Sequence, residues 1–220
     1  MPGCWEIKPS VFTAVLYVDV VQFSWALGLR RLRLNGPEPV GYTGMPYDHA
    51  RNAAAMNALE SGCDYLFFLD SDVVPPPDAV ERLVARNVPV VSGVYARRSP
   101  PETLPVAMVN GQWLSPKLPK NKLLEVHLVG AGCLLVHRSV LEKLPPIDPA
   151  RGKHWFDWRA DMRGCLPPGE ALSEDYSFNL HCRRNGIPIY LDTGVVCVHQ
   201  GGADYVPGRQ GPLNTINPAA

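Results

Sequence analysis

Residues Asp64 to Pro77, DYLFFLDSDVVPPP, decide the fold of this 220-residue chain. The run 64–69 is short, apolar and aromatic, which is typical of a strand buried on both faces. The three prolines at 75–77 then begin a helix, because proline is well suited to a first helical turn. The strand therefore delivers Asp70 and Asp72 to its carboxyl end.

Strands and helices alternate on either side of this stretch. The pattern predicts a mostly parallel, doubly wound sheet with helices on its faces, in which ligands bind outside the carboxyl ends of the strands. The later half of the chain predicts a smaller antiparallel, acceptor-side part and one long loop. The expected strands are 11–18, 64–69, 88–94, 106–113, 123–136, 187–191 and 195–198, the expected helices are 20–34, 48–61, 75–87, 139–144 and 173–185, and the loop is 145–172.

The length and net charge of the chain limit which classes of protein it can belong to. A chain of 220 residues fits one α/β domain, which we expect over residues 1–202 with a loosely ordered tail over 203–220. Lys plus Arg number 21 and Asp plus Glu number 21, so no overall field favours nucleic acid. No apolar run approaches the ~20 residues of a transmembrane helix, and the first residues lack a secretory signal pattern. We therefore expect a cytoplasmic protein.

Asp70-Ser71-Asp72 places two carboxylates directly after the apolar strand. Both can face one hard cation there, and oxygen ligands favour Mn²⁺ or Mg²⁺. Such a cation would bridge the phosphates of a nucleotide diphosphate. The alternative is a solvated Asp-Ser-Asp turn without a ligand.

Three further groups of residues are candidates for a site. His199 ends an apolar strand before two glycines and could complete a metal shell, or it could be a core histidine bonded to backbone. Glu174-Asp175 begins a helix, where acids also complement the helix dipole. Gly130-Ala131-Gly132 interrupts a strand-like run, which indicates either a close approach to a ligand or a kink.

The ordered set of motifs resembles the GT-A fold glycosyltransferases, especially the family-2-like enzymes, over about residues 10–202. Ala50-Arg51-Asn52 is similar to a helix motif near the nucleotide, and 64–77 is similar to the family's strand with its D-x-D. Residues 130–139 resemble the family's Gly-rich acceptor-side strand. Residues 173–178 resemble the start of its E-D helix. Residues 187–201 resemble its final strands, which end in a metal-binding histidine.

The resemblance implies a metal-dependent, hexosyltransferase-type enzyme that moves a sugar from a UDP- or GDP-sugar to an acceptor hydroxyl. It implies Asp70, Asp72 and His199 around an Mn²⁺ or Mg²⁺ ion, and Asp175 as the base if the enzyme inverts, with Glu174 beside it. The implied nucleotide-sugar contacts are Arg51, Asn52, Asp70, Ser71, Asp72, Gly130, Ala131 and Gly132. Inversion is weakly favoured, and the motifs leave the sugar, the base and the acceptor open.

The long loop is the expected source of acceptor contacts, because the chain leaves little room for a separate acceptor domain. Trp155 and Trp158 could stack on a sugar face there, or anchor the loop to the core. Two rival functions remain: a sugar-nucleotide nucleotidyltransferase, and a non-catalytic carbohydrate- or nucleotide-binding protein of the same fold. The N-terminal strand lacks the Gly-rich basic loop that holds a triphosphate, which disfavours the first rival.

Overall fold

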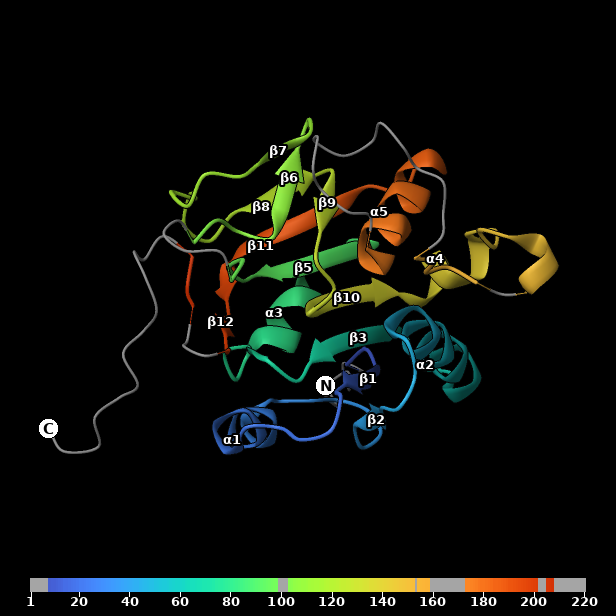
Figure 1. Cartoon of the computed structure of the whole chain (residues 1–220), viewed down its shortest axis with the longest axis horizontal. Helices are drawn as coiled ribbons and strands as arrows, with labels where there is room; N and C mark the ends of the chain where they lie inside the picture. The colour runs from blue at the N-terminus through green and yellow to red at the C-terminus, as the bar shows by residue number, and fades with distance from the viewer. Residues whose placement is uncertain (1–7, 99–102, 153, 159–172, 202–204, 208–220) are drawn as a thin grey trace, which may run out of the picture.

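A seven-stranded sheet forms the centre of the molecule in a computed structural model that describes residues 8–98, 103–152, 154–158, 173–201 and 205–207 (Figure 1). Five of the strands run in one direction, and β10 and β8 run in the opposite direction. The α/β class and the mostly parallel sheet are as predicted. The strand order is β2 (Val40–Tyr42), β1 (Val11–Leu16), β3 (Tyr65–Asp70), β10 (Cys133–His137), β5 (Val90–Val94), β11 (Ile189–Val196) and β8 (Leu123–Val126).

Helices cover both faces of the sheet, because successive side chains of a buried strand point to opposite faces. Phe68 packs with α2 (Tyr47–Ser61), α4 (Arg138–Lys143) and α5 (Glu174–Arg184). The neighbouring Phe67 and Leu69 pack with α1 (Phe23–Arg31) and α3 (Ala79–Ala85) on the other face. A short 3-10 helix spans Pro149–Arg151.

The predicted strand 123–136 is divided into three. β8 and β10 join the central sheet at different places, and β9 (Leu128–Val129) pairs with β6 (Ala107–Val109), which also pairs with β7 (Gln112–Trp113). Gly130-Ala131-Gly132 breaks the run between β9 and β10. The antiparallel part is therefore not confined to one side, because β10 lies between β3 and β5.

A two-strand sheet was not predicted. β4 (Val73–Val74) pairs with β12 (Val198–His199), with His199 opposite Val73. The backbone N–H of Gln200 also donates to the carbonyl of Asp72, at 2.6 Å. This pairing brings the end of the chain's last strand to the Asp-Ser-Asp turn.

Parts of the predicted loop and tail lie outside the described residues, namely 159–172 of the loop and most of 203–220. Within the described residues, no helix is both long enough and apolar enough to cross a membrane.

Candidate active site

The Asp-Ser-Asp turn is fixed at the carboxyl end of β3 by backbone bonds. The N–H of Asp70 donates to the carbonyl of Gly132 at 3.1 Å, and that of Ser71 donates to Leu16, the last residue of β1, at 2.9 Å. The indole of Trp25 on α1 donates to the carbonyls of Asp70 and Val73, at 3.0 Å each. The backbone that carries the two carboxylates is therefore held in place.

Arg51 connects this turn to the start of α5. Its side chain is buried on α2, where Nη2 donates to both carboxylate oxygens of Asp70, at 3.1 and 3.2 Å, and Nε donates to Glu174 at 3.0 Å. Burial alone would lower the pKa of Arg51, but the two carboxylates raise it. The guanidinium therefore stays charged and bridges residues that lie 123 positions apart.

The carboxyl groups of this cluster titrate above their ordinary range. Burial raises the pKa of Asp70, although Arg51 opposes the shift. Burial and the nearby charge of Asp175 raise the pKa of Glu174 from 4.5 to about 7. Both carboxyls are therefore harder to ionise than exposed ones.

Asp72 faces a second group of partners. Its Oδ2 lies 3.3 Å from Nε2 of His199 and 3.1 Å from Nη2 of Arg98, whose Nη1 donates to the carbonyl of Gln200 at 3.2 Å. Burial would raise the pKa of Asp72, but His199 and Arg98 together lower it. The Nδ1–H of His199 donates to the carbonyl of Ala96 at 2.7 Å, which directs Nε2 toward the carboxylate.

Asp175 is held in one orientation by donors from three directions. Its Oδ1 accepts from the backbone of Tyr176 at 2.9 Å and from the hydroxyl of Ser173, and its Oδ2 accepts from the backbone of Ala131 at 3.2 Å. The side chain is half-buried. The carboxylate is therefore fixed and still reachable.

The glycines of the Gly-Ala-Gly segment make room for neighbouring side chains. A Cβ on Gly130 would lie 1.9 Å from the hydroxyl oxygen of Tyr95, and one on Gly132 would lie 3.2 Å from Oδ2 of Asp70. The Tyr95 hydroxyl accepts from the N–H of Gly132 at 3.0 Å, and its ring packs edge-on against His199. The segment is thus shaped by close approach of Tyr95 and Asp70.

Two residues predicted to contact ligands, Asn52 and Trp155, instead hold the loop that follows α4. The amide of Asn52 is occupied by the 155–156 backbone, accepting from Trp155 at 2.8 Å and from Phe156 at 3.1 Å and donating to Phe156 at 2.8 Å. Trp155 is 1% exposed and donates to the carbonyl of Leu144, so it anchors the loop and offers no face to an acceptor. Trp158 is 45% exposed.

Sequence reasoning missed four side chains: Tyr95 and Arg98, which contact predicted site residues, and Arg97 and Trp113, which stack on each other. Arg97 and Arg98 follow β5, and consecutive basic residues at a strand's carboxyl end were a signal available in the sequence. Trp113 lies on β7, which is only two residues long, and its neighbours are distant in sequence. No local sequence pattern around Trp113 indicated this position.

A cavity of about 320 Å³ opens beside the turn, where β1 and β2 end and α2 begins. Tyr17, Tyr42, Met45 and Tyr47 are among its lining residues. The lining residue Tyr17 follows Leu16, whose carbonyl accepts from the N–H of Ser71, so the cavity lies near the acidic turn. Burial raises the pKa of Tyr47, and the charges of Asp70 and Asp72 raise it further.

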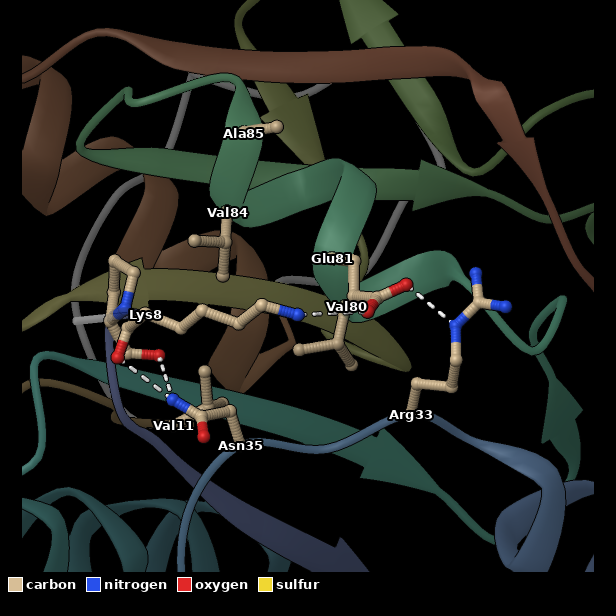
Figure 2. Close-up of a pocket in the computed structure, with 9 residues that line it drawn as sticks. Lys8, Val11, Arg33, Asn35, Val80, Glu81, Val84 and Ala85 are labelled. Carbon is tan, nitrogen blue, oxygen red and sulfur yellow. Dashed lines mark hydrogen bonds and ion pairs between the residues drawn. The ribbon is translucent and has the colours of Figure 1, made fainter. Parts of the chain in front are cut away.

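A separate, mostly apolar cavity of about 220 Å³ lies at the opposite end of β1, next to Val11 (Figure 2). Glu81 lines it, with a carboxylate oxygen 2.6 Å from Nε of Arg33 and the other 3.9 Å from Nζ of Lys8. None of the predicted site residues lines this cavity.

Among the residues that the structure describes, no three His, Cys, Asp or Glu side chains are grouped as a metal site. The structure brings Asp72 and His199 together, whereas Asp70 is paired with Arg51. The ligand roles of all three residues stay predictions.

The sequence matches no protein-family model and no curated protein. The structure is similar to that of A197 from STIV, with 19% identity, a TM-score of 0.65 and 94% of each chain covered. It is also similar to GalNAc-T7 in a structure with UDP, GalNAc and Mn²⁺, with 12% identity and a TM-score of 0.54 over 94% of this chain and 46% of that one. These likenesses show that the chain has a GT-A-like fold.

Proposed function

We propose that this chain is a glycosyltransferase that takes a sugar from a nucleoside-diphosphate sugar and gives it to an acceptor hydroxyl. The observation that carries the proposal is the facing pair Asp72 and His199, 3.3 Å apart, at the sheet edge that also bears Asp70, Glu174 and Asp175. A diphosphate and a developing hydroxyl charge both need groups of this kind at one place.

The Asp72–His199 pair fits a divalent cation. The carbonyl of Ala96 can only accept, so Nδ1 of His199 carries a proton and Nε2 is the nitrogen that faces a carboxylate oxygen of Asp72. Two acceptors at that distance repel each other unless a proton or a cation lies between them. Backbone-bonded imidazoles of this kind are typical metal ligands.

The charge of the site supports the same conclusion. Four carboxyl groups (Asp70, Asp72, Glu174 and Asp175) face two guanidinium groups (Arg51 and Arg98), which leaves a net negative charge when three or more of the carboxyls are ionised. Mn²⁺ or Mg²⁺ would neutralise it, and the structure of GalNAc-T7 contains Mn²⁺ together with UDP. When bound, such an ion stabilises the negative charge of the leaving diphosphate.

The cavity beside Tyr47 is the proposed site of the donor's nucleoside. It combines tyrosine rings with an opening next to the acidic turn, so a base and ribose there would direct the phosphates toward Asp72. A UDP- or GDP-sugar is the proposed donor, with a hexose as the transferred group. The side-chain amide of Asn52 is already bonded to the 155–156 backbone, so Asn52 is less available to contact the nucleotide than the sequence predicts.

Asp175 is the proposed base. Its carboxylate is oriented by Ala131, Ser173 and Tyr176, and it can take the proton of an acceptor hydroxyl that attacks the anomeric carbon with inversion. Glu174 is held by Arg51 and is therefore a positioning residue for the start of α5.

Release of nucleoside diphosphate from a panel of UDP- and GDP-hexoses, with Mn²⁺ and then with EDTA, tests the proposal. Asp72→Asn should abolish metal-dependent donor binding, whereas Asp175→Asn should keep donor binding and lose turnover. Asp78→Asn, at the half-buried start of α3, is the matched control. Pyrophosphate release from a nucleoside triphosphate would favour the nucleotidyltransferase instead, and tight donor binding without release would favour the binding protein.

A further inference from the structure

Exposed apolar side chains gather at one place on the surface of the described chain. Six of the eight large apolar side chains that are exposed there lie at or just before the starts of α1 and α2, namely Val18, Val20, Val21, Phe23, Met45 and Tyr47. Val20 is 89% exposed and Phe23 is 78% exposed. The two groups meet at the cavity of about 320 Å³, because Val18, Met45 and Tyr47 line it together. They therefore belong to one surface, and such a surface is typical of an interaction site.

The helix α1 has an inner and an outer face. Trp25 is buried and Leu29 packs on the same core cluster, so these residues hold the inner face against the sheet. Residues four positions apart share a face of a helix, and Leu27 follows Phe23 at that spacing. Leu27 is half-buried and belongs to none of the core clusters of the described residues. The outer face of α1, which lies at the lower margin of the molecule in Figure 1, is therefore apolar at its start.

Two arginines continue the outer face. Arg30 and Arg31 are exposed in the last turn of α1, seven and eight residues after Phe23, so they lie on its side of the helix. Within the described part of the chain, neither guanidinium has a hydrogen-bond or ion-pair partner. Asp19 is the only acid in the sequence from 17 to 31, so this segment carries an excess of positive charge. An apolar face joined to unpaired arginines is typical of helices that lie on a membrane surface.

We propose that the outer face of α1, with the loop before it, docks on the surface of a lipid bilayer that contains anionic lipids. We refer to Val20, Phe23, Leu27, Arg30 and Arg31 as the α1 face. Its apolar side chains enter the headgroup region, and its guanidinium groups bind lipid phosphates. Docking holds the neighbouring cavity next to the membrane, whatever that cavity binds.

Sedimentation of the whole chain with vesicles measures the docking. The probes are vesicles of phosphatidylcholine alone and mixed vesicles with equal shares of phosphatidylcholine and phosphatidylglycerol, each at low and at high salt. The chain should bind the mixed vesicles at least about fivefold more tightly than the neutral ones, because each basic residue near an anionic surface contributes about that factor. High salt should reduce the difference. Equal binding to both kinds of vesicle, or binding to neither at low salt, would overturn the proposal.

Variants assign the docking to the α1 face. Phe23→Ser should weaken binding to the mixed vesicles by about tenfold or more, since it removes the largest apolar side chain of the face. Arg30→Gln should weaken it by about fivefold. Two matched controls should bind as the wild type does. Trp158→Ser removes an exposed ring two residues after Phe156, which packs on the opposite face of the sheet from α1, and Arg183→Gln changes the last turn of α5. The urea midpoint of each variant should stay unchanged, because the replaced side chains are exposed.

A second copy of this chain is the alternative occupant of the α1 face. Analytical ultracentrifugation without lipid separates the two cases. The wild type and Phe23→Ser should both sediment as monomers at the concentrations used with vesicles. A wild-type dimer that Phe23→Ser converts to a monomer would overturn the proposal, as would vesicle binding that is unchanged in both Phe23→Ser and Arg30→Gln.

Discussion

Replacing Gly130 by alanine should destabilise the protein through one identifiable contact. The added Cβ would lie 1.9 Å from the hydroxyl oxygen of Tyr95 and 2.8 Å from a methyl of Val106, and the Tyr95 side chain is buried. Moving the ring costs about 1–3 kcal/mol as overpacking. It also breaks the bond from the N–H of Gly132, and a buried unpaired donor costs about 1–3 kcal/mol more.

The expected loss is therefore about 2–6 kcal/mol of unfolding free energy, a large share of the ~5–15 kcal/mol of a typical domain. Urea denaturation followed by fluorescence measures it. Tyr95→Phe alone should cost about 1–3 kcal/mol, because it removes the acceptor and leaves Gly132 unpaired. In that background Gly130→Ala should cost clearly less than in the wild type, since the oxygen it would meet is gone.

The double-mutant cycle decides between this contact and other causes. A coupling of at least about 1 kcal/mol supports it. The reasoning is refuted if the two losses simply add. It is also refuted if Gly130→Ala alone costs less than about 0.5 kcal/mol of unfolding free energy, because substitutions at the surface have effects of that size.

Three further substitutions test the buried cluster. Glu174→Gln imitates the protonated carboxyl: with the pKa of Glu174 raised from 4.5 to about 7, the wild type gains stability below pH 4.5 and loses it as the pH rises through 7. The variant's unfolding free energy relative to wild type should therefore rise by up to about 3 kcal/mol between pH 5 and pH 8 in thermal scans, and a fall would contradict the shift. Arg51→Met should cost about 3–5 kcal/mol in urea denaturation, because Asp70 and Glu174 lose their cation; a loss below about 1 kcal/mol would show that they are solvated. Asn52→Ala should expose Trp155 to a fluorescence quencher, and unchanged quenching would mean that the loop has other anchors.

Features that depend on neighbouring residues could be predicted from the sequence. The apolar run 64–69, the Ala-rich helix and the acidic start at 174–175 are set by neighbouring residues, and each is found close to its predicted place.

The remaining features depend on pairings between distant segments. β10 enters the sheet between β3 and β5, a choice made by long-range packing that no periodicity records. The ion pair of Arg51 with Glu174 and the stacking of Arg97 on Trp113 join segments that no local pattern connects. The sequence left open whether Trp155 stacks on an acceptor or anchors the loop, because a loop tryptophan has the same local pattern whether it faces solvent or the core; in the structure it is buried.

The short pairing of β4 with β12 also bears on when the site is completed during synthesis. Asp72 and His199 are 127 positions apart, and they are brought together by a pairing of two residues on each side and by the bond from the Gln200 N–H to the Asp72 carbonyl. A nascent chain can form β1, β3 and the Arg51 contact to Asp70 long before residue 199 emerges. Until then Asp72 lacks the imidazole, so ordered binding of a cation by this pair would report that the last strand has docked.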